Sequence, residues 1–269
     1  MIRFAQQCLA IGSRDLSIQR TYGLSALLAA CWASLGLIAY YFIGRLVDPG
    51  AGMHLAGGSY FAFVWSGISV QLLVAACMGA LGGALAREAA EGTLETALMA
   101  GAPLLALVVG GALAPLLLAA AQLAIHAGVG VALFELDFTA ARIAPACAAL
   151  LATVVSCAPI GLLGAAIWLR LRRAGIVTTA ALFAFGVVGG IYFPVELLPA
   201  PLPKIASWIP FTIGLEAVRG ALLEGAGWRE TLPALARLLV LTAVALPISL
   251  LALHRCLERA QRTGRLALV

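Results

Sequence analysis

The feature that most constrains the fold is a series of apolar runs longer than twenty residues. The clearest run extends from Leu104 to Phe134 and contains no Asp, Glu, Lys or Arg. A helix needs about 20 apolar residues to cross the hydrocarbon core of a bilayer. The runs lack the alternating polarity of a membrane β-strand, so they predict helices. Hydrophobic residues make up 63% of the chain and charged residues 11%, which excludes a water-soluble domain of this size.

We therefore predict an all-α integral membrane protein with a single transmembrane domain over residues 1–269. The segment Met1–Arg20 predicts a helix that lies on the membrane surface. Six spans are predicted after it: Thr21–Gly44, Tyr60–Ala86, Leu104–Phe134, Ile143–Leu169, Ala174–Phe193 and Ala234–His254.

The positive charges predict the orientation. If both termini lie on one side, that side carries eleven Lys and Arg residues and the other carries six. Basic residues gather on the cytoplasmic side of membrane proteins, so we expect cytoplasmic termini and a place in the cytoplasmic (inner) membrane. The net charge of +5 is explained in this way. Because the basic residues form no run interleaved with stacking aromatics, a nucleic-acid partner is not expected.

Several motifs are missing from the sequence. There is no G-x-x-x-x-G-K-[ST] phosphate loop, so the chain is not expected to hydrolyse ATP, and no catalytic or metal-binding motif occurs. None of the twelve acidic residues lies in the middle of a span, whereas ion-coupled transporters usually need such a carboxylate. This favours an external energy source over the alternative, an ion-coupled secondary transporter or channel that needs no ATPase. His126, inside the third span, predicts a hydrogen bond to a neighbouring helix rather than a proton relay.

Two segments between the spans differ from ordinary loops. In Arg87–Pro103, three glutamates with spacing i, i+3 and i+7 predict one acidic face of a short cytoplasmic helix, which either docks a soluble partner or is simply solvated. The segment Pro194–Trp228 holds five of the twelve prolines among apolar patches. It predicts short helices that dip back into the outer leaflet. Within it, Glu216 and Arg219 have the spacing of a helical ion pair, either at the surface or in gating.

The chain resembles the ABC type-2 permeases, the six-span membrane subunits of drug-resistance and polysaccharide exporters. The first resemblance is Glu88-x-x-Glu91-Gly92-Thr93-Leu94-Glu95 followed by Leu98 and Pro103, which is similar to the coupling helix of that family. The second is Phe193-Pro194-x-Glu196-x-Leu198-Pro199, then Trp208-Ile209-Pro210-Phe211, then Glu216-Ala217-Val218-Arg219, which is similar to its re-entrant outer helices. Ile209 stands where the family often has asparagine.

The resemblance implies a division of labour. Two permeases, identical or paralogous, would form the pathway, and separate cytoplasmic ATPase subunits would bind ATP and Mg, with no cofactor in this chain. The ATPase-coupling residues would be Glu88, Glu91, Gly92, Thr93, Leu94 and Glu95. The outer gating residues would be Pro194, Glu196, Pro199, Pro210, Glu216 and Arg219. The cargo would be a hydrophobic drug, a lipid or a lipid-linked glycan. The second and fifth spans would lie along the dimer pathway. Their motifs Gly79-x-x-x-Gly83 and Gly186-x-x-x-Gly190 predict internal helix packing.

Overall fold

The computed structural model describes residues 2–21, 23–46, 59–101, 103–134, 136, 138–171 and 175–262. The described residues contain helices and no strand, which confirms the all-α class for this part of the chain. The elements are α1 (Ile2–Thr21), α2 (Gly23–Leu46), α3 (Tyr60–Ala90), α4 (Leu94–Met99), α5 (Leu104–Phe134), α6 (Ile143–Leu171), α7 (Ile176–Val188), the 3-10 helix η2 (Val195–Leu197), α8 (Leu202–Ala206), α9 (Pro210–Leu223) and α10 (Trp228–Arg262).

Four of these helices are long and apolar enough to cross a membrane: α3, α5, α6 and the Trp228–Ala260 part of α10. The bounds of α5 are those predicted from the sequence. The helices α3 and α6 continue past their predicted ends at Ala86 and Leu169, to Ala90 and Leu171. Residues that favour helix formation follow each apolar run, so each helix continues beyond its last apolar residue.

The fifth and sixth predicted spans have different bounds in the structure. The helix α7 has 13 residues, fewer than a crossing requires, and it ends well before the predicted end at Phe193. The predicted start, Ala174, lies outside the described residues. Two glycines end the helix: a Cβ on Gly189 would lie 2.8 Å from Phe211 Cδ1, and Gly190 has a φ of +80°. By contrast, α10 begins at Trp228, before the predicted start at Ala234.

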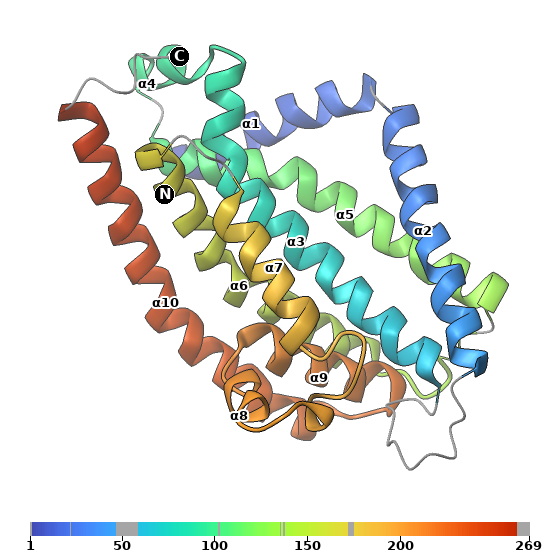
Figure 1. Cartoon of the computed structure of the whole chain (residues 1–269). Coiled ribbons are helices and arrows are strands. Elements are labelled where there is room, and N and C mark those ends of the chain that lie inside the picture. The colour runs from blue at the N-terminus through green and yellow to red at the C-terminus, as the bar shows by residue number, and fades with distance from the viewer. Residues whose placement is uncertain are drawn as a thin grey trace.

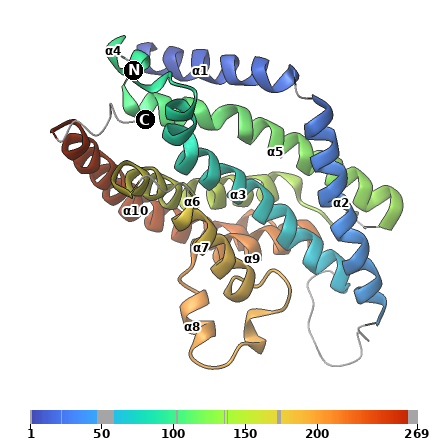
Figure 2. The ribbon, with the colours of Figure 1, turned by 45° about the horizontal axis from the view of Figure 1, so that its top comes forward.

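The first predicted span, Thr21–Gly44, corresponds to α2, and a separate helix α1 precedes it as expected. Figures 1 and 2 show α1 lying along one end of α5. The two helices approach closely at Gly110, where a Cβ would lie 3.0 Å from the carbonyl oxygen of Cys8. That α1 lies on the membrane surface stays a prediction.

The helix α3 lies at the centre of the fold and packs against α5 and α6, and α6 in turn packs against α9 and α10 (Figure 1). Glycines bring α3 and α6 together: a Cβ on Gly161 would lie 2.8 Å from the Met78 carbonyl oxygen, and one on Gly82 would lie 3.3 Å from the Gly161 carbonyl oxygen. The predicted packing glycine Gly79 instead has open space where its Cβ would be. The prediction of internal packing is therefore wrong for Gly79, and Gly82 is the glycine of α3 that faces α6.

The two segments singled out from the sequence lie at opposite ends of the molecule. Figure 1 shows α4 beside α1 at one end, and α8 and α9 at the other. The 31 residues of α3 extend about 46 Å at 1.5 Å per residue, so α3 is long enough to reach from one end to the other.

Candidate functional site

The turn between α3 and α4 does not have the predicted shape of one short acidic helix. The helix α3 ends at Ala90, the N–H of Glu91 donates to the Arg87 carbonyl oxygen at 2.9 Å, and Gly92 has a φ of +70°. The chain then starts the new helix α4 at Leu94. A left-handed residue cannot continue a helix, so Glu88 lies in α3, Glu91 in the turn and Glu95 in α4, and the three do not lie on one helix. The side chain of Glu95 lies outside the described residues.

Glu88 faces the interior, although the sequence analysis placed it among the residues that contact an ATPase. It is 5% exposed, and its carboxylate accepts hydrogen bonds from Arg14 Nη2 on α1 and from the hydroxyl of Thr93. The N–H of Thr93 also donates to the Glu88 carbonyl oxygen at 2.9 Å. A buried carboxylate is stable only when it is paired and hydrogen-bonded in this way. Glu88 and Thr93 therefore hold the turn together from the inside.

Arg14 attaches α1 to this turn. Besides bonding Glu88, its Nη2 lies 2.8 Å from Asp15 Oδ1. The hydrogen bond from Arg14 to the Glu88 carboxylate raises the pKa of this guanidinium above its ordinary value. On the neighbouring turn, Arg87 Nη2 donates to the carbonyl oxygens of Ala80 and Gly111 at 3.1 and 3.2 Å, and so links α3 to α5. These links were not predicted from the sequence, since α1 carries many polar residues and nothing marks Arg14 among them.

The outward side of the turn forms a small exposed surface, which we call the α4 surface: Glu91, Gly92, Thr96 and Met99. Met99 is a large apolar side chain that is 88% exposed. Leu94 points the other way and is 2% exposed in the core shared by α3, α5 and α6. The α4 surface is thus mixed in polarity and firmly supported, as a docking surface should be.

At the opposite end, Arg219 on α9 is the central polar residue. It is 6% exposed, and its Nε donates to Ser66 Oγ at 3.1 Å. Its Nη1 donates to the Gly190 carbonyl oxygen at 2.9 Å, and its Nη2 to those of Phe63 and Ile191 at 2.8 and 3.2 Å. The guanidinium also lies 3.5 Å from the centre of the Phe63 ring. One side chain therefore joins α9, α3 and the chain that follows α7.

The predicted ion pair between Glu216 and Arg219 is not formed. Arg219 turns into the protein, where carbonyl groups satisfy the guanidinium, while Glu216 is exposed. Glu216, Glu196 and Arg219 all line a surface hollow of about 210 Å³, but no ion pair within 4 Å joins Glu216 to Arg219. The i, i+3 spacing predicted the helix correctly but not the direction of the arginine.

The prolines of the outer segment divide it into short helices, as predicted from their number. Pro194 precedes η2 and Pro199 follows it. Pro210 is the first residue of α9, a position that suits a residue without an N–H because that group would have no helical partner. The depth of this segment in the membrane stays a prediction.

A groove of about 590 Å³ opens on the face formed by α3 and α7. Its walls are mainly apolar, with Phe183 74% exposed. Gln71, in the middle of α3, contributes a polar group and donates to the Leu182 carbonyl oxygen at 3.4 Å. Tyr192 closes one end and stacks on Tyr40 of α2 with ring centres 5.7 Å apart.

His126 does not make the predicted hydrogen bond to a neighbouring helix within the described residues. Its side chain is 1% exposed, and neither ring nitrogen has a partner among the described residues. Only its backbone is engaged, because the indole N–H of Trp65 donates to the His126 carbonyl oxygen at 3.3 Å.

The apolar spans, the separate turn at α4 and the short outer helices define a multi-spanning helical membrane protein. The chain belongs to the ABC-2 type transporter family, whose model matches residues 22–223. It is therefore the permease component of an ABC transporter, and the resemblance found in the sequence is confirmed at the level of the family. The comparison with curated proteins gives no match.

Proposed function

We propose that this permease belongs to an ATP-driven exporter that moves a hydrophobic drug, a lipid or a lipid-linked glycan across the cytoplasmic membrane. Separate cytoplasmic ATPase subunits bind ATP and Mg, and both termini of the permease lie in the cytoplasm. The observation that carries the proposal is the α4 surface, an exposed patch held rigidly against α1 and α3 by Glu88. An element that transmits force must be both accessible and firmly attached.

Glu91 is the residue on this surface best suited to contact the ATPase. It is exposed, unlike Glu88, and it lies at the tip of the turn beside Gly92. Gly92 has no side chain, and no other atom lies within 4 Å of its Cβ position, so a partner can approach the backbone closely there. Met99 supplies an apolar contact next to the charge. The mixture matches the composition of protein interfaces, where Met is enriched.

The helix α3 connects this contact to the outer end. Glu88, in its last turn, anchors α1 and α4, while Ser66 and the Phe63 carbonyl, near its first turns, accept hydrogen bonds from Arg219. A displacement of α4 therefore acts on the outer helices through one rigid element. Nucleotide drives the permease between two states only if the ATPase binds this surface more tightly in one of them.

The groove between α3 and α7 supports a pathway shared by two permeases. A monomer rarely leaves a large apolar side chain such as Phe183 in an open groove unless lipid or another subunit covers it. Gln71 is a polar group that a passing cargo can use within an otherwise apolar wall. These features favour a hydrophobic cargo.

The double variant Glu91→Arg with Glu95→Arg tests the proposal in proteoliposomes that contain the permease and its co-purified ATPase. Reversing both charges should lower ATP-dependent transport by about tenfold or more, a loss of about 1.4 kcal/mol of coupling. The permease should still insert, because the Glu88 network is unchanged.

Glu258→Arg is the matched control, since it reverses an exposed charge near the end of α10. It should leave ATP-dependent transport unchanged. Normal ATP-dependent transport in the double variant would remove the coupling role given to these glutamates. Transport that continues without ATP and stops when the ion gradient is collapsed would instead favour the ion-coupled alternative.

A further inference from the structure

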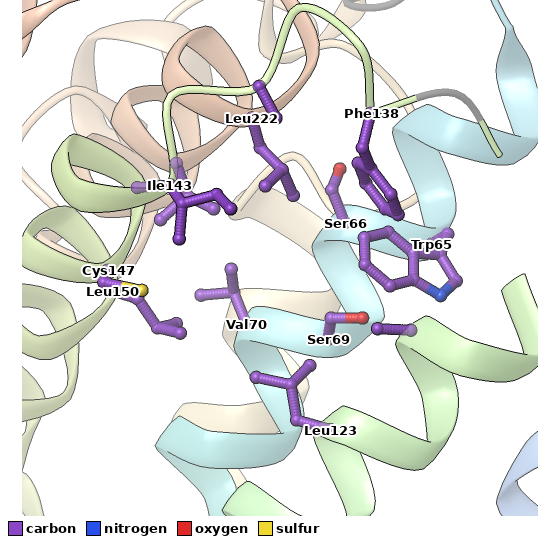
Figure 3. A pocket seen from close by; sticks show the side chains of 14 residues that line it. Trp65, Ser66, Ser69, Val70, Leu123, Phe138, Ile143, Cys147, Leu150 and Leu222 are labelled. Carbon is purple, nitrogen blue, oxygen red and sulfur yellow. The ribbon is translucent and has the colours of Figure 1, made fainter. Parts of the chain in front are cut away.

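A second cavity lies on the other side of α3 from the groove just described. It has a volume of about 300 Å³ and lies among α3, α5, α6 and α9. Figure 3 shows Trp65 and Phe138 on one wall, Cys147 and Leu150 on the opposite wall, and Val70 and Leu123 at its base. The rings of Trp65 and Phe138 have centres 5.4 Å apart. This volume is at the lower end of the range for small-molecule sites.

The cavity is reached from the side of α6. Ile143, which lines it, is 70% exposed, and Cys147 one turn further along α6 is also exposed. Because α6 has 29 residues, more than a crossing requires, its exposed first turns lie at the edge of the hydrocarbon core. A molecule dissolved in the bilayer therefore has direct access.

One polar side chain in the wall is unsatisfied. Ser69 is 5% exposed, and its hydroxyl has no hydrogen-bond partner among the described residues. Ser66, one turn earlier, is fully engaged, since it donates to the Phe63 carbonyl oxygen and accepts from Arg219. A buried hydroxyl without a partner costs about 1–3 kcal/mol. The hydroxyl oxygen is itself covered by protein atoms, so a ligand recovers that energy once the Ser69 side chain rotates to turn its hydroxyl toward the cavity.

We infer that this cavity is a binding site for a compact apolar molecule with one hydrogen-bonding oxygen, such as a phenol or a small alcohol. The apolar walls exclude a charged ligand, and the volume excludes a whole phospholipid. The ring of Trp65 favours a flat aromatic body against it. The ligand enters from the bilayer beside Cys147, and its oxygen pairs with Ser69. This site stands independently of the coupling at α4, because it requires no ATPase.

The test compares 2-naphthol with naphthalene, which differ by the single hydroxyl. Binding to the full chain in detergent micelles is measured by protection of Cys147 from alkylation with N-ethylmaleimide, followed by mass spectrometry of the Cys147 peptide. We expect naphthol to bind about fivefold more tightly than naphthalene, since one neutral hydrogen bond contributes about 1 kcal/mol.

Two variants make the result specific. In Ser69→Ala the two compounds should bind equally, because only the partner of the naphthol hydroxyl is lost. Naphthalene should still protect Cys147 from alkylation. In Val70→Phe the cavity is filled, and neither compound should protect Cys147. The inference is overturned if the preference persists in Ser69→Ala, if both compounds protect the parent chain equally, or if Val70→Phe remains protected.

Discussion

At the scale of residues, Arg219 shows why a buried cation can be kept in an apolar protein. Its planar guanidinium donates to four acceptors on two segments, α3 and the chain after α7, and the Phe63 ring covers its face. A lysine has a single nitrogen on a flexible stem and cannot reproduce this geometry. Arg219 is thus a positioning residue that fixes the outer helices on α3.

Arg219→Lys should lower the stability of the purified permease by about 2–3 kcal/mol, since hydrogen bonds of a charged group are worth about 1.5–3 kcal/mol and several are lost. Thermal unfolding in detergent, followed by tryptophan fluorescence, measures the change. Arg237→Lys is the control, because that arginine is exposed and donates only to the Ser207 carbonyl oxygen at 2.8 Å. Equal effects of the two substitutions would contradict the role given to Arg219.

The sequence predicts which residues of the chain are polar, but not the direction in which they point. Glu88, Glu91 and Glu95 looked alike because their spacing fits one helix. Glu88 lies in the last turn of α3 and is buried, whereas Glu91 follows the end of that helix and is exposed. The left-handed Gly92 then separates both of them from Glu95 in α4. A glycine signals a turn but does not by itself say where a helix ends. The same limit made Arg219 look like a partner of Glu216.

At the scale of elements, close contact between α3 and α6 depends on glycine. The backbone of Met78 lies directly where a Cβ on Gly161 would be, and a backbone cannot move aside as a side chain can. This contact joins two of the four helices that are long enough to span a membrane, and α6 also packs against α9 and α10.

Gly161→Ala should therefore destabilise the protein by about 1–3 kcal/mol, the usual range for overpacking. Gly128→Ala on α5 is the matched change, because nothing lies within 4 Å of its Cβ position. It should leave the melting temperature unchanged or raise it slightly, since alanine favours a helix. The two melting temperatures in the same detergent decide the question, and no difference between them would show that α3 and α6 are not in close contact.

Apolar run length predicted the bounds of α5, and it predicted those of α3 and α6 to within a few residues. It failed for α7, where the run continues through Gly189 and Gly190 to Phe193. Hydropathy does not distinguish an apolar helix from an apolar turn, because both are buried in protein or lipid. The turn was set by the approach of Phe211, a contact between distant parts of the sequence.

At the scale of the whole molecule, the account requires two permeases whose α3 and α7 faces meet. Phe183→Cys should form a disulfide-linked pair of permeases in membranes under mild oxidation, because this residue is 74% exposed in the groove. Leu239→Cys on α10 is 65% exposed on a different helix and should not. The linked pair is detected by gel electrophoresis without reductant, and the parent chain shows how much pairing its own cysteines cause. Linkage through Leu239→Cys alone would assign the interface to the other face.

The central claim is that work enters through the turn between α3 and α4 on the cytoplasmic side. It is tested most directly by labelling Glu91→Cys in intact cells with a membrane-impermeant maleimide, against the parent chain. Glu224→Cys, an exposed position beyond α9 at the other end, reports the outer side. We predict that Glu224→Cys is labelled in intact cells and that Glu91→Cys is labelled only after permeabilisation. Labelling of Glu91→Cys in sealed cells would place the turn outside and contradict the account.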